Sequence, residues 1–331
     1  MTKKYLPSKL DWRSFLSSPW LKVVVALAVI GALLSFNRIE MSTFQLLRES
    51  WGWLVLAFVA MLPPYVIVSF RFWIVLNNQG IECELPSAVR WTMIGSFFDL
   101  MMPSNSGGDI VKAGYLLQEV PGGGRTKAMM AIALDRVLGL IGLFLLAAIS
   151  CLIGWEVIVN LPGITGIVSI LAVLCVLPLA FFRILGSRRI YGSKGLKRLL
   201  GHLPMGTLIF SIIGCFNRLR EKPLQLVIVL GLSIINHLFW CTALFCVSMA
   251  FGQQVGISQG FVVFPMAIFS NIFGFAGGFG VGTAAFDVIF VALLNIQIGA
   301  VIGLVFQMLS AISRLLGLPY YLGAGSRKKA I

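Results

Sequence analysis

The residues best suited to chemistry lie in a polar interruption of an otherwise apolar sequence. An apolar run that includes Gly95 stops at Pro103, and the chain restarts after a turn of small polar residues. Backbone N–H groups at a helix start are unpaired and the helix dipole favours negative charge there, so such a start can bind an anion. The segment therefore predicts a phosphate or headgroup site made of Ser104, Asn105, Ser106, Gly107, Gly108, Asp109 and Lys112. The alternative is a capped turn with a lysine that extends to the membrane surface.

A second pair of charges, Asp135 and Arg136, lies roughly 12 Å into a long apolar run, judged by helix rise. Charges at that depth are costly, and they face the interior of a helix bundle or a cavity. Neighbouring residues on a helix do not face each other, so these two need separate partners. We expect Arg136 to bind a lipid phosphate and Asp135 to pair with Lys112 or Arg71. A structural ion pair between helices is the alternative.

Other polar residues inside apolar runs are weaker candidates. Asp99 and Asp287 belong to two interrupted apolar segments. Asn236 and His237 are expected to form hydrogen bonds between helices. Arg314 is expected to reach the membrane surface from the end of its helix. The chain has six cysteines and two histidines without metal-ligand spacing, so we expect no metal and no cofactor.

Composition indicates a membrane protein. Hydrophobic residues make up 58% of the 331 residues and charged residues only 11%, whereas a soluble domain has about 45–50% and about 25%. The formal net charge is +14, and the basic residues lie between the apolar runs and at the termini, as the positive-inside rule describes. We therefore expect an all-α, multi-pass membrane protein that does not bind nucleic acid.

Apolar runs predict six membrane-spanning helices, over residues 20–36, 51–76, 128–153, 164–182, 224–251 and 298–322. The second span is expected to kink at Pro63-Pro64. Two further runs are interrupted, and their arms cover 91–102 with 110–118 and 261–275 with 283–296. The first of these arms would cover only roughly 18 Å of a roughly 30 Å hydrocarbon core. We therefore predict two re-entrant, broken helical hairpins instead of two further spans.

Basic residues set the expected orientation. Nine of them, against the single acid Glu221, lie in the insert 183–222, which marks it as a cytoplasmic loop with an amphipathic helix over 208–216. Six spans then place both termini in the cytoplasm. The two hairpins become parts of an inverted repeat, which in transporters marks the binding site. The chain divides into an interfacial N-terminal segment (1–18), a transmembrane domain (19–323) and a basic tail (324–331).

Three groups of residues resemble a known family. They are Arg71-Phe-Trp73, then Pro103 with Gly107-Gly-Asp109 and Lys112, then Leu134-Asp-Arg136 with Gly139. Their order and spacing are similar to those of the transmembrane domain of lysylphosphatidylglycerol synthases, a flippase-like family of integral membrane proteins. The resemblance covers about residues 15–322. In that family the later glycine-rich break carries an acid that this chain lacks, and Asp287 is the candidate replacement.

The resemblance implies that the chain translocates a phospholipid or a lipid-linked intermediate between the leaflets of the bacterial plasma membrane. Its partners would be a membrane phospholipid or polyprenyl-linked lipid, with a second copy of the chain or a cytoplasmic enzyme as protein partner. The soluble aminoacyltransferase domain of the two-domain synthases is missing from this sequence, so we do not expect an enzyme. Two alternatives stay open: an intramembrane lipid-headgroup or polyprenyl-phosphate glycosyl transferase, and a non-catalytic subunit that anchors a cytosolic partner through 183–222.

Overall fold

Helices make up almost all of the chain that the structure describes. The computed structural model describes residues 50–101, 107–120, 124–153, 155–159, 206–271 and 278–327, with single positions between 165 and 201. The predicted first span, most of the fourth span and the N-terminal segment lie outside these residues, as do Ser104, Asn105 and Ser106. Within the described ranges every regular element is a helix, which confirms the all-α prediction.

Four helical segments are long and apolar enough to cross a membrane: Trp51–Asn78, Arg125–Ile153, Pro223–Ala250 and Gly299–Ala324. They correspond to four of the six predicted spans. The first combines α4 (Trp51–Ala60) with α5 (Pro63–Asn78). Pro63 and Pro64 occupy the first turn of α5. Backbone N–H groups in a first turn have no partner within the helix, so the N–H groups that proline lacks are not missed there. The span is thus interrupted at Met61 and Leu62, directly before the predicted position of the kink.

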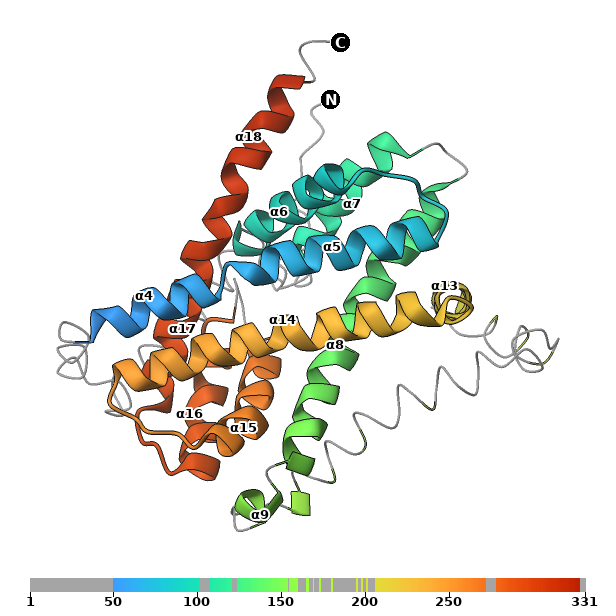
Figure 1. The fold of residues 1–331 in the computed structure, drawn as a ribbon. Coiled ribbons are helices and arrows are strands. Elements are labelled where there is room, and N and C mark those ends of the chain that lie inside the picture. Colours follow the sequence, from blue (N-terminus) through green and yellow to red (C-terminus); the bar gives the residue numbers. More distant parts are fainter. Residues whose placement is uncertain are drawn as a thin grey trace, which may run out of the picture.

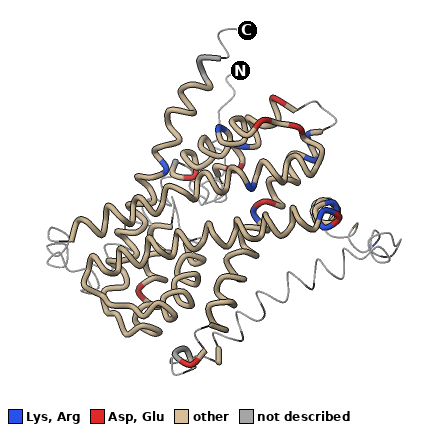
Figure 2. The backbone as a smooth tube through the Cα atoms, in the orientation of Figure 1, with Lys and Arg blue, Asp and Glu red and all other residues tan. Residues whose placement is uncertain are grey.

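The other three spans are α8 (Arg125–Ile153), α14 (Pro223–Ala250) and a composite of α17 (Gly299–Arg314), a 3-10 turn (Leu315–Gly317) and α18 (Leu318–Arg327). Figure 2 shows that α4 and α14 carry no charged residue. Large apolar side chains such as Leu152, Leu224 and Val288 are exposed on the outside of the bundle. An apolar outer surface is what a helix bundle presents to hydrocarbon, and together these features define a multi-pass membrane protein.

Two pairs of shorter helices form the interrupted segments. Helix α6 (Leu85–Met101) packs against α7 (Gly107–Glu119), and α15 (Ile257–Ser270) packs against α16 (Val281–Leu294). Figure 1 shows the two pairs on opposite sides of the paired helices α5 and α14. The first arm begins at Leu85 and not at Trp91 as predicted, because Pro86 suits the first turn of a helix. The inverted relation between the two halves stays a prediction.

Two hydrophobic clusters hold the bundle together. One contains Phe72 of α5 and Leu134 of α8, and the other contains Phe264 of α15. Helix α14 connects them, since its Val229 belongs to the first cluster and its Leu244 to the second. The polar residues in the middle of α14 therefore lie between two apolar cores.

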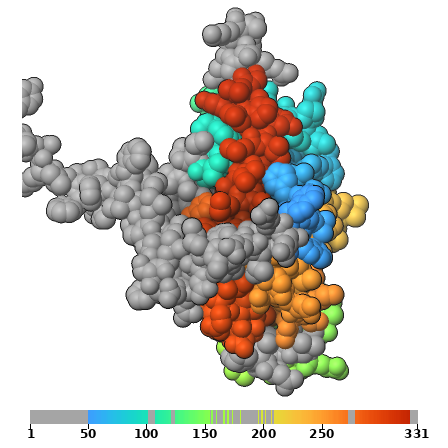
Figure 3. All heavy atoms as spheres, turned by 90° about the vertical axis from the view of Figure 1, so that its left-hand side faces the viewer, coloured from blue at the N-terminus to red at the C-terminus, as the bar shows by residue number. Residues whose placement is uncertain are grey.

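Two further helices of the described chain lie outside the spans and the hairpins. The amphipathic helix predicted over 208–216 is longer, α13 (Gly206–Arg220), and it packs on α8 through a buried face that includes Cys215 and Leu219. A single turn, α9 (Trp155–Ile158), follows α8. Helix α18 packs along α6 and covers one side of the first hairpin, as Figure 3 shows.

Candidate functional site

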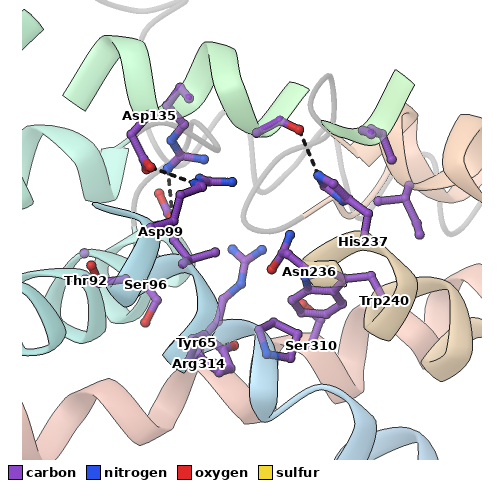
Figure 4. A pocket seen from close by; sticks show the side chains of 18 of the residues that line it. Tyr65, Thr92, Ser96, Asp99, Asp135, Asn236, His237, Trp240, Ser310 and Arg314 are labelled. Carbon is purple, nitrogen blue, oxygen red and sulfur yellow. Dashed lines mark hydrogen bonds and ion pairs between the residues drawn. The ribbon is translucent and has the colours of Figure 1, made fainter. Parts of the chain in front are cut away.

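The charged residues singled out in the sequence, apart from Asp287, meet in one pocket. The pocket has a volume of about 400 Å³ and is lined by residues from α5, α6, α7, α8, α14, α15 and α17. Figure 4 shows its polar side chains converging from these helices on a common space. Six of these helices contribute polar residues, so helix packing brings together groups that are far apart in the sequence.

A buried ion pair forms one end of the pocket. Arg71 Nε donates to Asp135 Oδ1 at 2.8 Å, and both side chains are only 5% exposed. Arg71 Nη1 also donates to Ser233 Oγ at 3.1 Å, which ties α5 and α8 to α14. Gly139 lies one turn after Asp135, and a Cβ there would stand 3.2 Å from Arg71 Nη1. The absence of a side chain at Gly139 therefore leaves room for the guanidinium. Of the two partners predicted for Asp135, the structure shows Arg71.

The neighbouring Arg136 has different partners, as its position on the helix requires. Its Nε lies 2.5 Å from Asp109 Oδ2 on α7, and its Nη2 lies 3.5 Å from Asp99 Oδ2 on α6. The Arg136 side chain is 49% exposed, so the cation can also reach a ligand from the open side of the pocket. Arg136 thus connects α8 to both arms of the first hairpin.

The start of α7, predicted as an anion site, is engaged by the protein itself. The Gly108 N–H donates to Asp99 Oδ1 at 2.8 Å. A Cβ on Gly108 would lie 2.0 Å from the Gly95 carbonyl oxygen, so α6 and α7 approach here as only glycine permits. This backbone donor therefore serves the closure of the hairpin, while Gly107 and Gly108 are both buried.

Lys112, one turn after Asp109, is 4% exposed and lines the pocket. Its Nζ lies 3.3 Å from the centroid of the Phe72 ring, a cation–π contact. Within the described ranges no carboxylate lies at ion-pair distance from this ammonium group. The structure therefore brings Lys112 into the pocket without an ion-pair partner among the described acids.

Sequence reasoning missed one wall of the pocket, where Arg314 projects from α17. It was expected to reach the membrane surface, and that prediction was wrong: the residue lines the pocket in the middle of a long span. Its Nη1 is buried and has no hydrogen-bond partner among the described residues. The signal was available, because Leu315, Leu316 and Leu318 continue the apolar run beyond Arg314.

Two polar residues of α14 complete this wall. His237 Nε2 contacts the Gly139 carbonyl oxygen at 3.1 Å, which provides the expected bond between helices. His237 Nδ1 and Asn236 Oδ1 are buried and have no hydrogen-bond partner in the described part of the chain. Figure 4 shows Arg314 extending toward the Asn236 side chain, with Trp240 beside them.

The second hairpin uses most of its polar groups for its own packing. Asp287 Oδ1 accepts from the Ala300 N–H at 3.3 Å, in the first turn of α17, and Asp287 does not line the pocket. Gln307 Nε2 donates to Asn271 Oδ1 at 2.9 Å and to the Gly278 carbonyl oxygen at 3.0 Å. The proposed replacement for the family's acid is therefore part of a helix contact.

A bundle of long apolar helices around a half-buried, charged pocket defines a multi-pass membrane protein with an intramembrane polar site. The chain belongs to the family described as the lysylphosphatidylglycerol synthase TM region, whose family model matches residues 20–317. This match confirms the resemblance drawn from the sequence motifs. Comparisons with curated proteins and with solved structures gave no match.

Proposed function

We propose that this protein binds the phosphate of a phospholipid or lipid-linked intermediate in the pocket and moves the lipid between leaflets. The supporting observation is the charge of the pocket wall. Among the described residues that line it, four basic side chains (Arg71, Lys112, Arg136 and Arg314) stand against three acidic ones (Asp99, Asp109 and Asp135), a formal excess of one positive charge. The family takes its printed name from synthases of an aminoacylated phospholipid, which supports a lipid as the ligand.

The physical need for such a pocket comes from the hydrocarbon. An unpaired ion is very costly in a medium of low dielectric constant, and partner charges and hydrogen bonds reduce that cost. A headgroup that enters the pocket would exchange water for fixed donors, while its acyl chains stay beside the apolar outer surface. Lys112 and Arg136 would supply the positive charge nearest to the first hairpin.

A headgroup transferase is the less well supported alternative. Such an enzyme needs a carboxylate free to act as a general base. Asp135 is engaged with Arg71, and Asp109 is engaged with Arg136. These pairings favour binding over proton transfer, so we treat the chain as a binding and transport protein and not as an enzyme.

The same proposal covers orientation. In a bacterial plasma membrane, both termini and the basic insert 183–222 would lie in the cytoplasm, where a partner enzyme or a second copy of the chain could dock. Reporter fusions at residue 190 and after residue 331 test this arrangement, and an external signal from either fusion would contradict it.

The function is tested with purified protein in liposomes that contain tail-labelled phospholipid, by following the loss of outer-leaflet label to a membrane-impermeant quencher. Wild-type protein should raise the quenched fraction above the outer-leaflet share. Lys112→Ala and Arg136→Ala should each slow this movement about tenfold or more, because a hydrogen bond to a charged group contributes about 1.5–3 kcal/mol. The exposed Lys127→Ala is the matched control. Movement no faster than in protein-free liposomes would overturn the proposal, and variants as fast as wild type would remove these two residues from it.

A further inference from the structure

We infer that Arg314, Asn236 and His237 form a headgroup subsite that selects phosphodiester lipids carrying hydroxyl or primary-amine hydrogens. The inference rests on the proposed function and adds a substrate class to it. The subsite occupies the wall of the pocket formed by α14 and α17.

The cations of the pocket differ in their interaction partners. Arg71 pairs with Asp135, Arg136 pairs with Asp109, and Lys112 lies over an aromatic ring. Arg314 has a buried Nη1 with no acceptor in the described part of the chain. A buried N–H without an acceptor is unfavourable, so a phosphate oxygen in the pocket would stabilise the Arg314 side chain.

Asn236 is 5% exposed, and its Oδ1 accepts no hydrogen bond from the described residues. It lies on the pocket wall next to the arginine, so the subsite offers an acceptor beside a donor. A phosphate alone would satisfy the arginine and leave this oxygen unpaired. The asparagine therefore calls for an O–H or N–H group on the same ligand.

The tautomer of His237 is defined by a backbone contact. Its Nε2 faces a carbonyl oxygen, that of Gly139, so this nitrogen must carry the hydrogen. The imidazole has no carboxylate partner in the described ranges, and burial favours its neutral form. A neutral ring that donates from Nε2 has a lone pair at Nδ1, which is the nitrogen without a partner. The subsite thus presents two acceptors, Asn236 Oδ1 and His237 Nδ1, beside the Arg314 donors.

This donor and acceptor pattern distinguishes headgroups that share the same phosphodiester. A glycerol headgroup offers hydroxyl hydrogens and an ethanolamine headgroup offers ammonium hydrogens. A choline headgroup offers neither, because its nitrogen is fully methylated. Lipids of the first two kinds can satisfy both sides of the subsite, whereas phosphatidylcholine would leave the two acceptors buried and unpaired.

The test uses the full chain in liposomes and measures the movement of tail-labelled phosphatidylglycerol, phosphatidylethanolamine and phosphatidylcholine with identical acyl chains. Wild type should move the first two at least about tenfold faster than phosphatidylcholine. Asn236→Leu should reduce the preference, because His237 Nδ1 is then the remaining acceptor of the subsite, and should leave the phosphatidylcholine rate unchanged. Arg314→Gln should slow all three lipids. Ile235→Leu, a neighbouring residue that is 44% exposed on the lipid-facing side, is the matched control and should change nothing.

The outcomes separate the subsite from the proposed function. Equal rates for the three lipids, or a preference that Asn236→Leu leaves undiminished, would overturn the subsite while translocation stands. If no lipid moves, translocation fails, and the lipids retained by purified protein after incubation with an equimolar mixture then decide the subsite by mass spectrometry. Retention of the hydroxyl- and amine-bearing lipids over phosphatidylcholine would support the subsite, and equal retention would overturn it.

Discussion

Asp99 Oδ1 accepts a hydrogen bond from the backbone N–H of Gly108 at 2.8 Å, which joins the end of α6 to the start of α7 in the first hairpin. The same carboxylate lies 3.5 Å from Arg136, so the hairpin is joined to α8 by charge as well as by packing. A helix start that would otherwise attract an anion is thus held by an internal one. Among the described residues, the pocket cations without a carboxylate at ion-pair distance are Lys112 on α7 and Arg314 on α17.

The close approach of α6 and α7 predicts that Gly108→Ala is destabilising. The new methyl group would lie 2.0 Å from the Gly95 carbonyl oxygen, and the helices would have to separate, at a cost of about 1–3 kcal/mol. Gly114→Ala on the same helix is the control, because nothing lies within 4 Å of the added carbon. Thermal unfolding in detergent should show a lower midpoint for the first variant only. Equal midpoints would contradict the described packing.

The buried pair of Arg71 and Asp135 predicts strong coupling between the two residues. Asp135→Leu alone leaves an unpaired buried guanidinium, and Arg71→Met alone leaves an unpaired buried carboxylate, each at a cost of about 3–5 kcal/mol. The double variant removes both charges and should be much more stable than the sum of the two losses predicts. A double-mutant cycle on unfolding free energies measures this coupling. Additive losses would show that the two side chains do not interact.

The loop between α5 and α6 predicts a slow thiol at Cys83. Burial, assisted by the nearby negative charge of Glu119, raises the pKa of this thiol to about 11. Little reactive thiolate is then present at pH 8, and the rate of maleimide labelling should keep rising as the pH approaches that value. Glu119→Gln should lower the pKa and speed labelling at pH 8. Labelling at pH 8 as fast as that of a free model thiol would contradict the burial of this loop.

The helix contact of Asp287 predicts that this acid has no direct part in lipid movement. Asp287→Asn retains the oxygen that accepts from the Ala300 N–H, so transport should stay close to that of wild type. Asp135→Asn, by contrast, weakens the partner of Arg71 inside the pocket and should slow transport markedly. Both variants are compared in the liposome assay at equal protein content. A loss of transport in Asp287→Asn at unchanged thermal stability would return this residue to the functional site.

The helices could be predicted from the sequence because hydrocarbon imposes a local rule. A span must be long and apolar, and Pro63 and Pro64 act on the helix that contains them. The sequence predicts two possible partners for Asp135, Lys112 and Arg71, because a buried carboxylate needs a cation. In both cases the deciding interaction depends on residue type and approximate depth alone.

The position of Arg314 in the pocket could not be predicted, because the sequence of one span does not contain the information that decides it. Whether an arginine reaches the membrane surface or faces a cavity is set by the neighbouring helices, here α5 and α14. The hydrogen bond from the Gly108 N–H to Asp99 likewise depends on how α6 and α7 pack in the hairpin. Tertiary contacts of this kind decide function without leaving a periodic pattern in the sequence.

The most direct test of the account is a high-resolution map of the full chain purified with native lipids in a nanodisc. We expect headgroup density inside the pocket, with phosphate oxygens within hydrogen-bond distance of Arg314. The Lys112 ammonium should face the same space, and the acyl chains should lie against the apolar outer surface. A pocket that contains only water, with all ordered lipid confined to the outside of the bundle, would contradict it.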